Sequence, residues 1–369
     1  MALTKENLLT EYQETPYETH QLFLKSFEKL PFDPLNLEHN TDNQVKYTIS
    51  KPTTGMGAGG IDMVDEKNEE KSIINQNDDR LTLLNAYMTA FTRRISLGPE
   101  NNTLLTRTYT TPDKGQSAYF RHIIKLEPST RYLLVDRVTG TGEKAFLSDC
   151  SDFILNDSTE LTYIRIVEGN GSAYAFNSHF YINKSGRLKV VELVTNVDYY
   201  RGKVQADLIG EGGEVRIHSG FSTGLSDKID HTVMVKNDAM QTTGHAFQRA
   251  IVNGSSKALL KGLMKITDRA INSNSFLDQH SLLLSRSSFS LAIPGLEIDN
   301  NELKAKHSAS VSQIDGDQLF YLMTRGLDRD QAVDLVAQGF LTPIVKEMPT
   351  ELMNEMIKEG KVYGITSQG

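Results

Sequence analysis

The sequence predicts a mainly β protein, in which a solenoid of stacked β coils is flanked by helical segments at both ends. Three observations indicate this fold class. Residues 105–312 are nearly all short runs of alternating character, separated by Gly, Asn, Asp and Ser. No long helical pattern interrupts these runs, which argues against βαβ units. Residues 1–104 and 313–369 instead place apolar residues at helical spacing.

The run "KALLKGLMKI" shows the alternation of the core most clearly. Lysines occupy one face of it, and the other face carries Ala258, Leu260, Gly262, Met264 and Ile266. On pattern alone a sandwich, a barrel and a β-helix all remain open. Very short strands, small residues and sharp polar turns favour the solenoid, although no strict repeat is visible.

The N-terminal region, residues 1–104, is expected to be helical with loops. Thr15 is placed to cap a first helix with Pro16 at its first position. A second amphipathic helix is expected over 78–98, with Gly98 as its end. Between them, 51–80 is Gly-rich and then charged, and we expect a mobile loop. Its "TTGMGAGG" lacks the Lys of a P-loop and the strand and helix of a dinucleotide-binding turn.

The C-terminal region, residues 313–369, is predicted to form three helices. Asp315 and Asp328 each stand three residues before a Gln, which is the spacing of a capping box. Gly326 and Gly339 are expected to end the first two helices. The third is "PTELMNEMIKEG". These short helices cannot enclose a large core, so they must pack on the strands or on a partner.

Charge and composition narrow the class of function. The formal charge of −8 argues weakly against nucleic acid as the main partner. No apolar run approaches the roughly 20 residues that span a bilayer, and the N-terminus lacks the apolar segment of a signal peptide. The single cysteine, Cys150, excludes an intrachain disulfide framework and a zinc site of several thiolates. We therefore expect a cytoplasmic protein.

Several residues suggest chemistry, and each has a plainer interpretation. Asp149, Asp152 and Asp157 could form a carboxylate pair of a glycosidase or lyase, but turn chemistry is the commoner reason for such clustering. Asp230-His231 resembles a fragment of a triad without its nucleophile elbow. Cys150 in a Ser/Asp-rich stretch is favoured as an incidental thiol over a reactive one.

His307 is the most informative single residue, because it stands alone in a Ser/Ala strand that switches at once to a helix. Neutral imidazole binds iron, zinc and copper. From spacing alone, a histidine satisfied by hydrogen bonds in a sheet is the favoured interpretation.

The stretch 296–340, "LEIDNNELKAKHSASVSQIDGDQLFYLMTRGLDRDQAVDLVAQGF", resembles the C-terminal signature of the SufB/SufD family, the scaffold proteins of Suf iron–sulfur cluster assembly. The residues that carry the resemblance are Leu296, Glu297, Ile298, His307, Leu319, Phe320, Tyr321, Leu322, Arg325, Gly326, Gly339 and Phe340. The runs 201–235 and 252–266 are similar to upstream coils of that family. The likeness covers about 200 to the mid-340s well, 105–200 loosely and the first hundred residues not at all.

The resemblance implies a right-handed parallel β-helix core over 105–312 and a non-enzymatic subunit that pairs through this core with a SufB-like chain or itself. It implies that residues around 315–345 dock on the Suf ATPase, an ABC-type subunit. The residues expected in that dock are Leu319, Phe320, Tyr321, Arg325, Gly326 and Phe340. His307 falls on the family's histidine near the dimer interface, where the nascent cluster is thought to sit.

Two departures from the SufB pattern resemble the companion subunit SufD. Gln279 occupies the position of a cluster cysteine, and Ser308 follows the histidine where SufB has Glu. Clusters are held mostly by thiolates, so the isolated chain is expected to bind no cofactor. His307 would be one ligand of a transient cluster at a subunit interface, with His280 as a second candidate donor and thiolates from the partner.

Two rival hypotheses come from other classes of protein. The first is a carbohydrate-active β-helix enzyme, which requires carboxylates gathered on one face of the coils. The second is a structural solenoid that binds other proteins through its surface.

Overall fold

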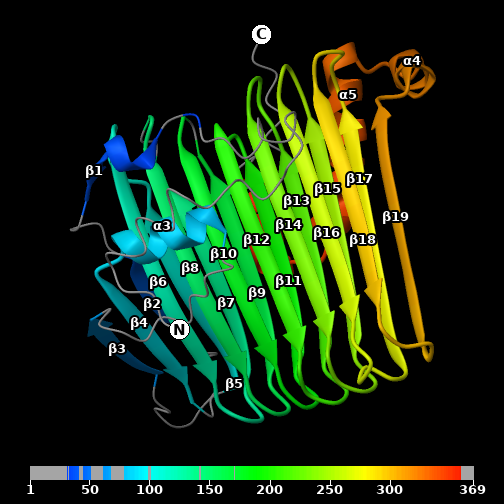
Figure 1. Ribbon diagram of the computed structural model, residues 1–369. Helices are drawn as coiled ribbons and strands as arrows, with labels where there is room; N and C mark the ends of the chain where they lie inside the picture. Colours follow the sequence, from blue (N-terminus) through cyan, green and yellow to red (C-terminus); the bar gives the residue numbers. More distant parts are fainter. Residues whose placement is uncertain are drawn as a thin grey trace.

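Two β-sheets face each other, and the chain passes from one to the other in a parallel β-solenoid of about 7 turns (Figure 1). The structure is a computed structural model that describes residues 31, 33–40, 45–50, 61–67, 79–98, 101–140, 143–169 and 171–358. The sequence predicted a mainly β solenoid with helical segments at both ends; the mainly β solenoid and the C-terminal helices are confirmed. Among the described residues, no helix is both long and apolar enough to cross a membrane.

Each sheet is built from every second strand of the chain. Sheet A holds, in spatial order, β18 (Phe289–Ile298), β16 (Lys257–Ile266), β14 (Lys228–Asn237), β12 (Tyr199–Leu208), β10 (Ala173–Ile182), β8 (Phe146–Leu155), β6 (Gln116–Leu126), β4 (Phe91–Leu97) and β3 (Ile61–Lys67), with β1 (Glu38–His39) also on β6. Sheet B holds β19 (Leu303–Gln313), β17 (Ser273–Leu283), β15 (Thr243–Val252), β13 (Glu214–Ser222), β11 (Arg187–Thr195), β9 (Glu160–Glu168), β7 (Arg131–Thr139), β5 (Asn101–Thr110) and β2 (Lys46–Ser50). The ladders are parallel except for β2 with β5 and β3 with β4.

The coils differ in length, and this explains why the sequence shows no strict repeat. Ala173 pairs with Tyr199, 26 positions later, whereas Lys257 pairs with Phe289, 32 positions later. The strands keep their register while the turns between them vary. A fixed sequence period is therefore absent although the architecture is repetitive.

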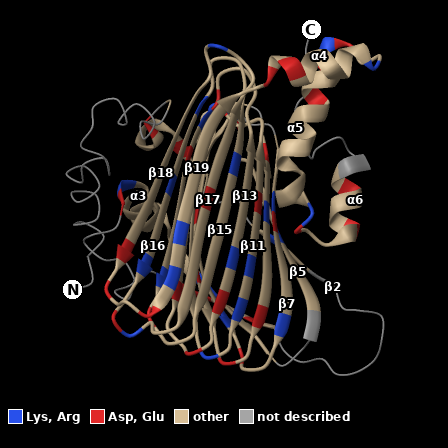
Figure 2. Ribbon diagram, turned by 90° about the vertical axis from the view of Figure 1, so that its right-hand side faces the viewer, with Lys and Arg blue, Asp and Glu red and all other residues tan. Residues whose placement is uncertain are grey.

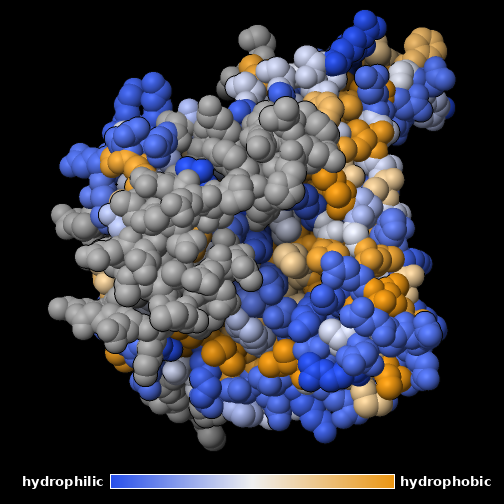
Figure 3. Space-filling view, in the orientation of Figure 1, coloured by the Kyte–Doolittle hydropathy of each residue, from blue (hydrophilic) through white to orange (hydrophobic). Residues whose placement is uncertain are grey.

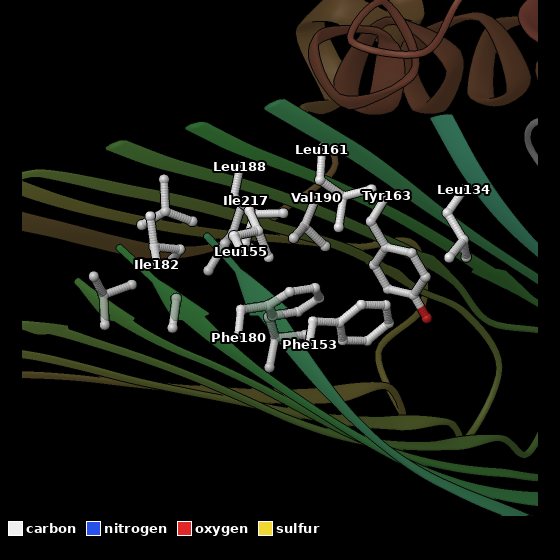
Figure 4. Close-up of a cluster of buried hydrophobic side chains, with 14 of the residues drawn as sticks. Leu134, Phe153, Leu155, Leu161, Tyr163, Phe180, Ile182, Leu188, Val190 and Ile217 are labelled. Carbon is white, nitrogen blue, oxygen red and sulfur yellow. The ribbon is translucent and has the colours of Figure 1, made fainter. Parts of the chain in front are cut away.

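Inward-facing apolar side chains from both sheets fill the interior (Figure 4). Phe153 and Phe180 stack with ring centroids 4.4 Å apart, and Tyr163 packs against both rings. In β16 the predicted inward face is confirmed for Ala258, Leu260, Met264 and Ile266, which are fully buried. Burying a Leu, Ile or Met side chain of this kind contributes roughly 1.5–3 kcal/mol.

A row of buried polar side chains runs through this apolar interior, and we call it the interior polar line. Its members are Arg107, Asp136, Tyr163, Arg165, Glu192, His231, Gln248 and Gln279. In its first half Arg107 donates two hydrogen bonds of 2.7 Å to Asp136. Tyr163 donates to the same carboxylate at 2.5 Å and accepts from Arg165. Each bond joins neighbouring coils or residues of one strand.

The second half of the line is centred on Glu192. Its carboxylate lies 2.8 Å from Nε2 of His231 and 3.4 Å from Nη1 of Arg165. The Nε2 of Gln248 lies 2.7 Å from Nδ1 of His231, and Gln279 donates to Gln248 at 2.6 Å. Although burial opposes ionisation, His231 and Arg165 hold the pKa of Glu192 at about 2. The Glu192 carboxylate therefore stays ionised although it is buried inside the solenoid.

The N-terminal region differs from the helical prediction. α3 (Arg80–Met88) is capped by Asp79 and ends ten residues before Gly98, and β4 follows it. Residues 91–97 form a strand that pairs with β3 and β6. Their side chains include the β-branched residues Thr92 and Ile95, which fit a sheet. β3 lies within the predicted loop 51–80. The expected helix after Thr15 and the Gly-rich run 51–60 lie outside the described residues. A short 3₁₀ helix, Pro34–Asn36, precedes β1.

The C-terminal helices are α4 (Gly316–Thr324), α5 (Arg329–Val345) and α6 (Thr350–Lys358) (Figure 2). The capping box of Asp328 and Gln331 is confirmed, whereas Asp315 caps α4 through the backbone N–H of Asp317 alone. The prediction that Gly339 ends its helix is wrong. α5 continues because burying residues such as Leu341 and Ile344 outweighs the cost of about 1 kcal/mol for an interior Gly.

α5 and α6 cover the outer face of sheet B over β7 to β15. Their apolar side chains pack on the outward residues of those strands; the cluster contains Val135, Ile164, Ile166, Val191, Leu193, Ile344, Val345, Met348, Leu352 and Met356. Gly220 lets α5 approach β13, since a Cβ there would lie 3.2 Å from Ile344. Ion pairs join Lys189 to Glu347 and Arg137 to Glu355 at 2.9 Å each.

The first prediction concerns the interior polar line. Glu192→Ala removes the buried carboxylate that binds His231 and Arg165, so the free energy of unfolding should fall by about 3–5 kcal/mol. Urea unfolding measures this. The control is Glu214→Ala, which removes an exposed carboxylate 4.0 Å from Arg187 and should cost less than about 1 kcal/mol. Equal losses in the two variants would contradict a structural role for the line.

The second prediction concerns His218, which lies beneath the C-terminal helices and stacks on Phe247 at 4.8 Å. Burial lowers its pKa to about 4, against the attraction of Glu347 and with the repulsion of Lys189, Arg216 and His245. The unfolded chain therefore binds the proton more readily than the folded chain. As pH falls from about 6.5 to 4, stability should drop by up to about 3 kcal/mol.

Chemical unfolding at a series of pH values measures this loss. His218→Gln removes the titrating group, so its stability curve should be flatter than the native curve between pH 6.5 and 4. Parallel curves for the two proteins would show that His218 is not the group responsible.

Candidate functional site

The C-terminal end of the solenoid is an open coil formed by β18 and β19. Each of these strands pairs on one side only among the described strands, with β16 and β17. The register places His307 beside Leu277, so both side chains belong to the interior-facing row. Leu277 is fully buried, whereas His307 and the inward-facing Val311 are exposed because no further described coil covers them.

His280 lies on the opposite face of sheet B from His307. It pairs with Ser310, and its neighbours in β17, Leu277 and Gln279, are buried in the interior. The ring of His280 lies 2.8 Å from Asp278 and 2.5 Å from the hydroxyl of Ser310. The structure therefore does not bring His280 and His307 together within one chain.

Gln279 is fully buried at the end of the interior polar line. Its Nε2 donates to Gln248, while its Oε1 has no hydrogen-bond partner among the residues that the structure describes. Ser308 lies on the outer face, where its hydroxyl contacts Asp278. The two positions at which the sequence departs from SufB thus point to different sides of the sheet.

The three aspartates considered as a carboxylate pair are separated by the strand. Asp149 faces the interior and binds His122 at 2.6 Å, and Asp152 lies on the outer face of β8. Asp157 belongs to the turn after β8, where it accepts from the backbone of Lys184. The contact of Asp157 supports its interpretation as a turn residue. No two of these three carboxylates face each other across a common cleft.

The remaining candidates are also explained by packing. His231 belongs to the interior polar line, whereas Asp230 faces outward and binds Arg201 at 2.9 Å and Lys261 at 3.1 Å. Cys150 is buried, and burial raises the pKa of its thiol well above the ordinary range. A thiol in this state is a poor nucleophile and metal ligand. In the part of the chain that the structure describes, no three His, Cys, Asp or Glu side chains gather into a metal site.

α4 follows β19 directly and stands clear of the sheets (Figure 2). Leu319 is its buried anchor, whereas Phe320 and Tyr321 are 68% and 55% exposed. Arg325 lies over the ring of Tyr321 at 5.1 Å. Gly326 ends the helix with φ of +99°, a conformation that favours glycine.

Two further residues are exposed on α4 and α5 that were not among the residues expected from the sequence in the ATPase dock. Met323 on α4 and Leu335 on α5 are 42% and 48% exposed. Both are apolar residues of the predicted helices, and the docking of α5 on sheet B leaves Leu335 on the outward side. Phe340 is half-buried instead, with Arg249 over its ring at 5.3 Å. We call the exposed set Phe320, Tyr321, Met323 and Leu335 the aromatic knob.

Comparisons with known proteins agree with this geometry. The family model described as "SUF system FeS cluster assembly, SufBD core domain" matches residues 109–340. An iron–sulfur cluster assembly SufBD family protein of Staphylococcus aureus strain USA300 is 30% identical over 154 residues, which are 41% of this chain and 33% of the relative. Proteins of the same family from S. aureus strain NCTC 8325 and S. haemolyticus strain JCSC1435 match to the same extent.

The match spans about a third of these relatives, and their names do not separate SufB from SufD. The family model, in contrast, covers more than half of this chain and coincides with the strands from β6 to β19 and with α4 and most of α5. The chain therefore belongs to the SufBD family of the SUF iron–sulfur cluster assembly system.

Proposed function

We propose that the chain is a SufD-like, non-enzymatic assembly subunit that works in the cytoplasm. It pairs through the open coil with a SufB-like chain or with itself, and it docks an ABC-type ATPase with its C-terminal helices. The observation that carries the proposal is the adjacency of two exposed surfaces, the open coil and the aromatic knob, joined by the short link from β19 to α4.

The open coil has the properties of a pairing surface. β18 and β19 are long edge strands, and such edges are templates for pairing with another chain. Large apolar side chains are exposed on them, namely Phe289, Ile293, Ile298 and Val311. Figure 3 shows hydrophobic residues along this end of sheet A. A second chain with a similar edge would continue the interior and bury Ile298 and Val311, whereas Phe289 and Ile293 lie on the outer face of sheet A beside that edge.

His307 is the group of this coil that suits a shared cluster. It is exposed on the interior-facing row, next to the place where a partner's last coil would lie. Cys150 is buried in β8 with a raised pKa and cannot supply a thiolate there. The cluster is cargo in this proposal, held by His307 and by thiolates of the partner.

A SufD-like role is supported over a SufB-like role by Gln279. At this position the family's scaffold subunit carries a cysteine, and here an amide is fixed inside the solenoid by its bond to Gln248. Ser308 likewise offers a hydroxyl on the outer face rather than a carboxylate at the coil end. The chain is thus better suited to complete a cluster site on a partner than to form such a site by itself.

The aromatic knob suits an obligate protein contact. Exposed Phe and Tyr side chains supply large apolar area with few rotatable bonds, which is typical of binding hot spots. Because α5 is anchored on sheet B and α4 continues from β19, a motor that moves α4 would pull on the open coil. This connection gives the ATPase a physical route to the pairing surface.

The third prediction tests the cluster ligand. The chain and a SufB-like partner are reconstituted with iron and sulfide, and bound iron is measured together with visible absorption. His307→Ala should lower the iron affinity on the order of tenfold or more. The control is His245→Ala, which removes a half-buried imidazole from the outer face of β15. His280→Ala tests the second candidate donor in the same assay.

An unchanged iron yield for His307→Ala, with pairing intact by size-exclusion chromatography, would refute the ligand role. The same samples separate the rival functions. A carbohydrate-active enzyme turns over a polysaccharide without a partner, and a plain structural solenoid brings no iron into the complex.

The fourth prediction tests the ATPase dock. Phe320→Ser combined with Tyr321→Ser should weaken co-purification of the ATPase by roughly 30-fold in affinity, the effect of losing about 2 kcal/mol of hot-spot contact. The matched control is Leu225→Ser, because Leu225 is 69% exposed in a turn between β13 and β14. Circular dichroism should be unchanged for both variants.

These point variants are preferable to deletion of 313–369, which would also expose the apolar cluster under α5 and α6. Undiminished ATPase binding by the double variant would contradict docking through the aromatic knob.

A further inference from the structure

Sheet A has a notch beside β6 at the N-terminal end of the solenoid. β1 pairs with β6 at Gln116 and Ser117, and β4 pairs with it only from His122 onward. Over 118–121 no described strand lies on that side of β6. An opening in a sheet connects its two faces, so outward and inward side chains of β6 can line one space.

A cavity of about 310 Å³ occupies this notch. Outward-facing Arg121 and inward-facing His122 both line it, together with residues of β2 and β4 and of the link after α3. Six rings form much of its wall; they belong to His39, Tyr47, Phe91, Tyr119, Phe120 and His122. Ring-lined cavities of this size favour flat aromatic ligands.

The charges at the cavity favour an anion. Two guanidinium groups line it, and the single carboxylate among the described lining residues, Asp65, is already held by Arg93 through bonds of 2.6 and 2.7 Å. Arg121 is 6% exposed, and among the described residues its Nη1 is buried without a hydrogen-bond partner. A buried N–H donor that lacks a partner is costly, and an anionic ligand group would relieve this cost.

The cavity also has a fixed polar wall. The hydroxyl of Tyr47 lies 2.6 Å from Nε2 of His122, whose Nδ1 lies 2.6 Å from Asp149. Burial lowers the pKa of His122 and raises that of Tyr47 to about 12. At neutral pH the imidazole therefore donates to Asp149 and accepts from Tyr47. Arg93 also donates to the Tyr47 hydroxyl, so one lone pair of this oxygen remains that can accept a hydrogen bond from an N–H group.

We propose that this notch is a binding site for a flat aromatic ligand with an anionic group, of the nucleoside monophosphate type. The base lies among the six rings, the anionic group binds Arg121, and an exocyclic amino N–H of the base donates to Tyr47. Arg121 also lines a neighbouring hollow of about 140 Å³ together with Lys203, Asn177 and the carboxylate of Asp152, so a phosphate on Arg121 would bind on the cavity side, away from Asp152. This site is at the opposite end of the solenoid from the open coil.

The isolated full-length chain is titrated with AMP by isothermal calorimetry and by ligand-observed NMR. Adenosine lacks the anion, inorganic phosphate lacks the ring, and 4-hydroxybenzoate carries a carboxylate on a ring without N–H. AMP should bind at least about tenfold more tightly than adenosine or phosphate, since a charge-assisted hydrogen bond contributes roughly 1.5–3 kcal/mol. Tighter binding of 4-hydroxybenzoate than of AMP would identify an aromatic carboxylate as the ligand source.

Arg121→Gln should weaken AMP binding about 10- to 100-fold, and Arg121→Lys should restore part of the loss. The matched control is Arg94→Gln, because Arg94 lies next to Arg93 on β4 but pairs with Glu66 and does not line the cavity. If Arg121→Gln fails to fold by circular dichroism, Ala90→Phe replaces it. Ala90 is an exposed lining residue, and a ring there should block binding without changing charge.

The proposal is overturned if neither AMP nor 4-hydroxybenzoate binds at about 1 mM, or if Arg121→Gln and Ala90→Phe bind AMP as tightly as the Arg94→Gln control. Neither SufB-like partner nor ATPase is present in these titrations. Their outcome is therefore independent of the proposed assembly function.

Discussion

The interior polar line is the constraint on which the rest of the structure depends. Burying an ion such as Arg165 or Glu192 costs several kcal/mol unless its partners are in place. Here the partners belong to successive coils, so each buried charge is satisfied only when the next coil is stacked in register. The line thus selects one arrangement of strands that hydrophobic packing alone would leave less specific, because most inward positions accept any apolar residue of similar size.

The same stacking rule determines the two ends. A coil is stabilised by the coils on either side, so the last coil has one neighbour and exposes its inner row, including His307 and Val311. At the other end the first strands leave a notch beside β6, where Arg121 and His122 share a cavity. The open coil and the notch therefore both form where the repetitive stacking of coils stops. At each of them polar side chains are left where a ligand or a partner chain could take the place of the missing coil.

The polar line also joins these ends physically. At the notch, His122 binds Asp149, whose second oxygen accepts from Ser151, and Ser151 in turn accepts from Arg107. From there the line reaches Gln279 in the last coil but one. A substitution in its middle would therefore disturb the ordering of both surfaces through the register of the coils, without any direct contact with either.

The sequence by itself determined the alternation of strands such as β16, the cap at Asp328 and the family signature around His307, because these depend on residues close together in the chain. Only the tertiary structure decided that Glu192 and His231 face inward, that α5 continues through Gly339 and that β4 replaces a predicted helix. In each case the deciding neighbour lies on another coil or helix. The free energy gained by contact with that neighbour exceeds the local preference of the residue for helix or strand. The pattern of nearby residues in the chain carries no information about this contact.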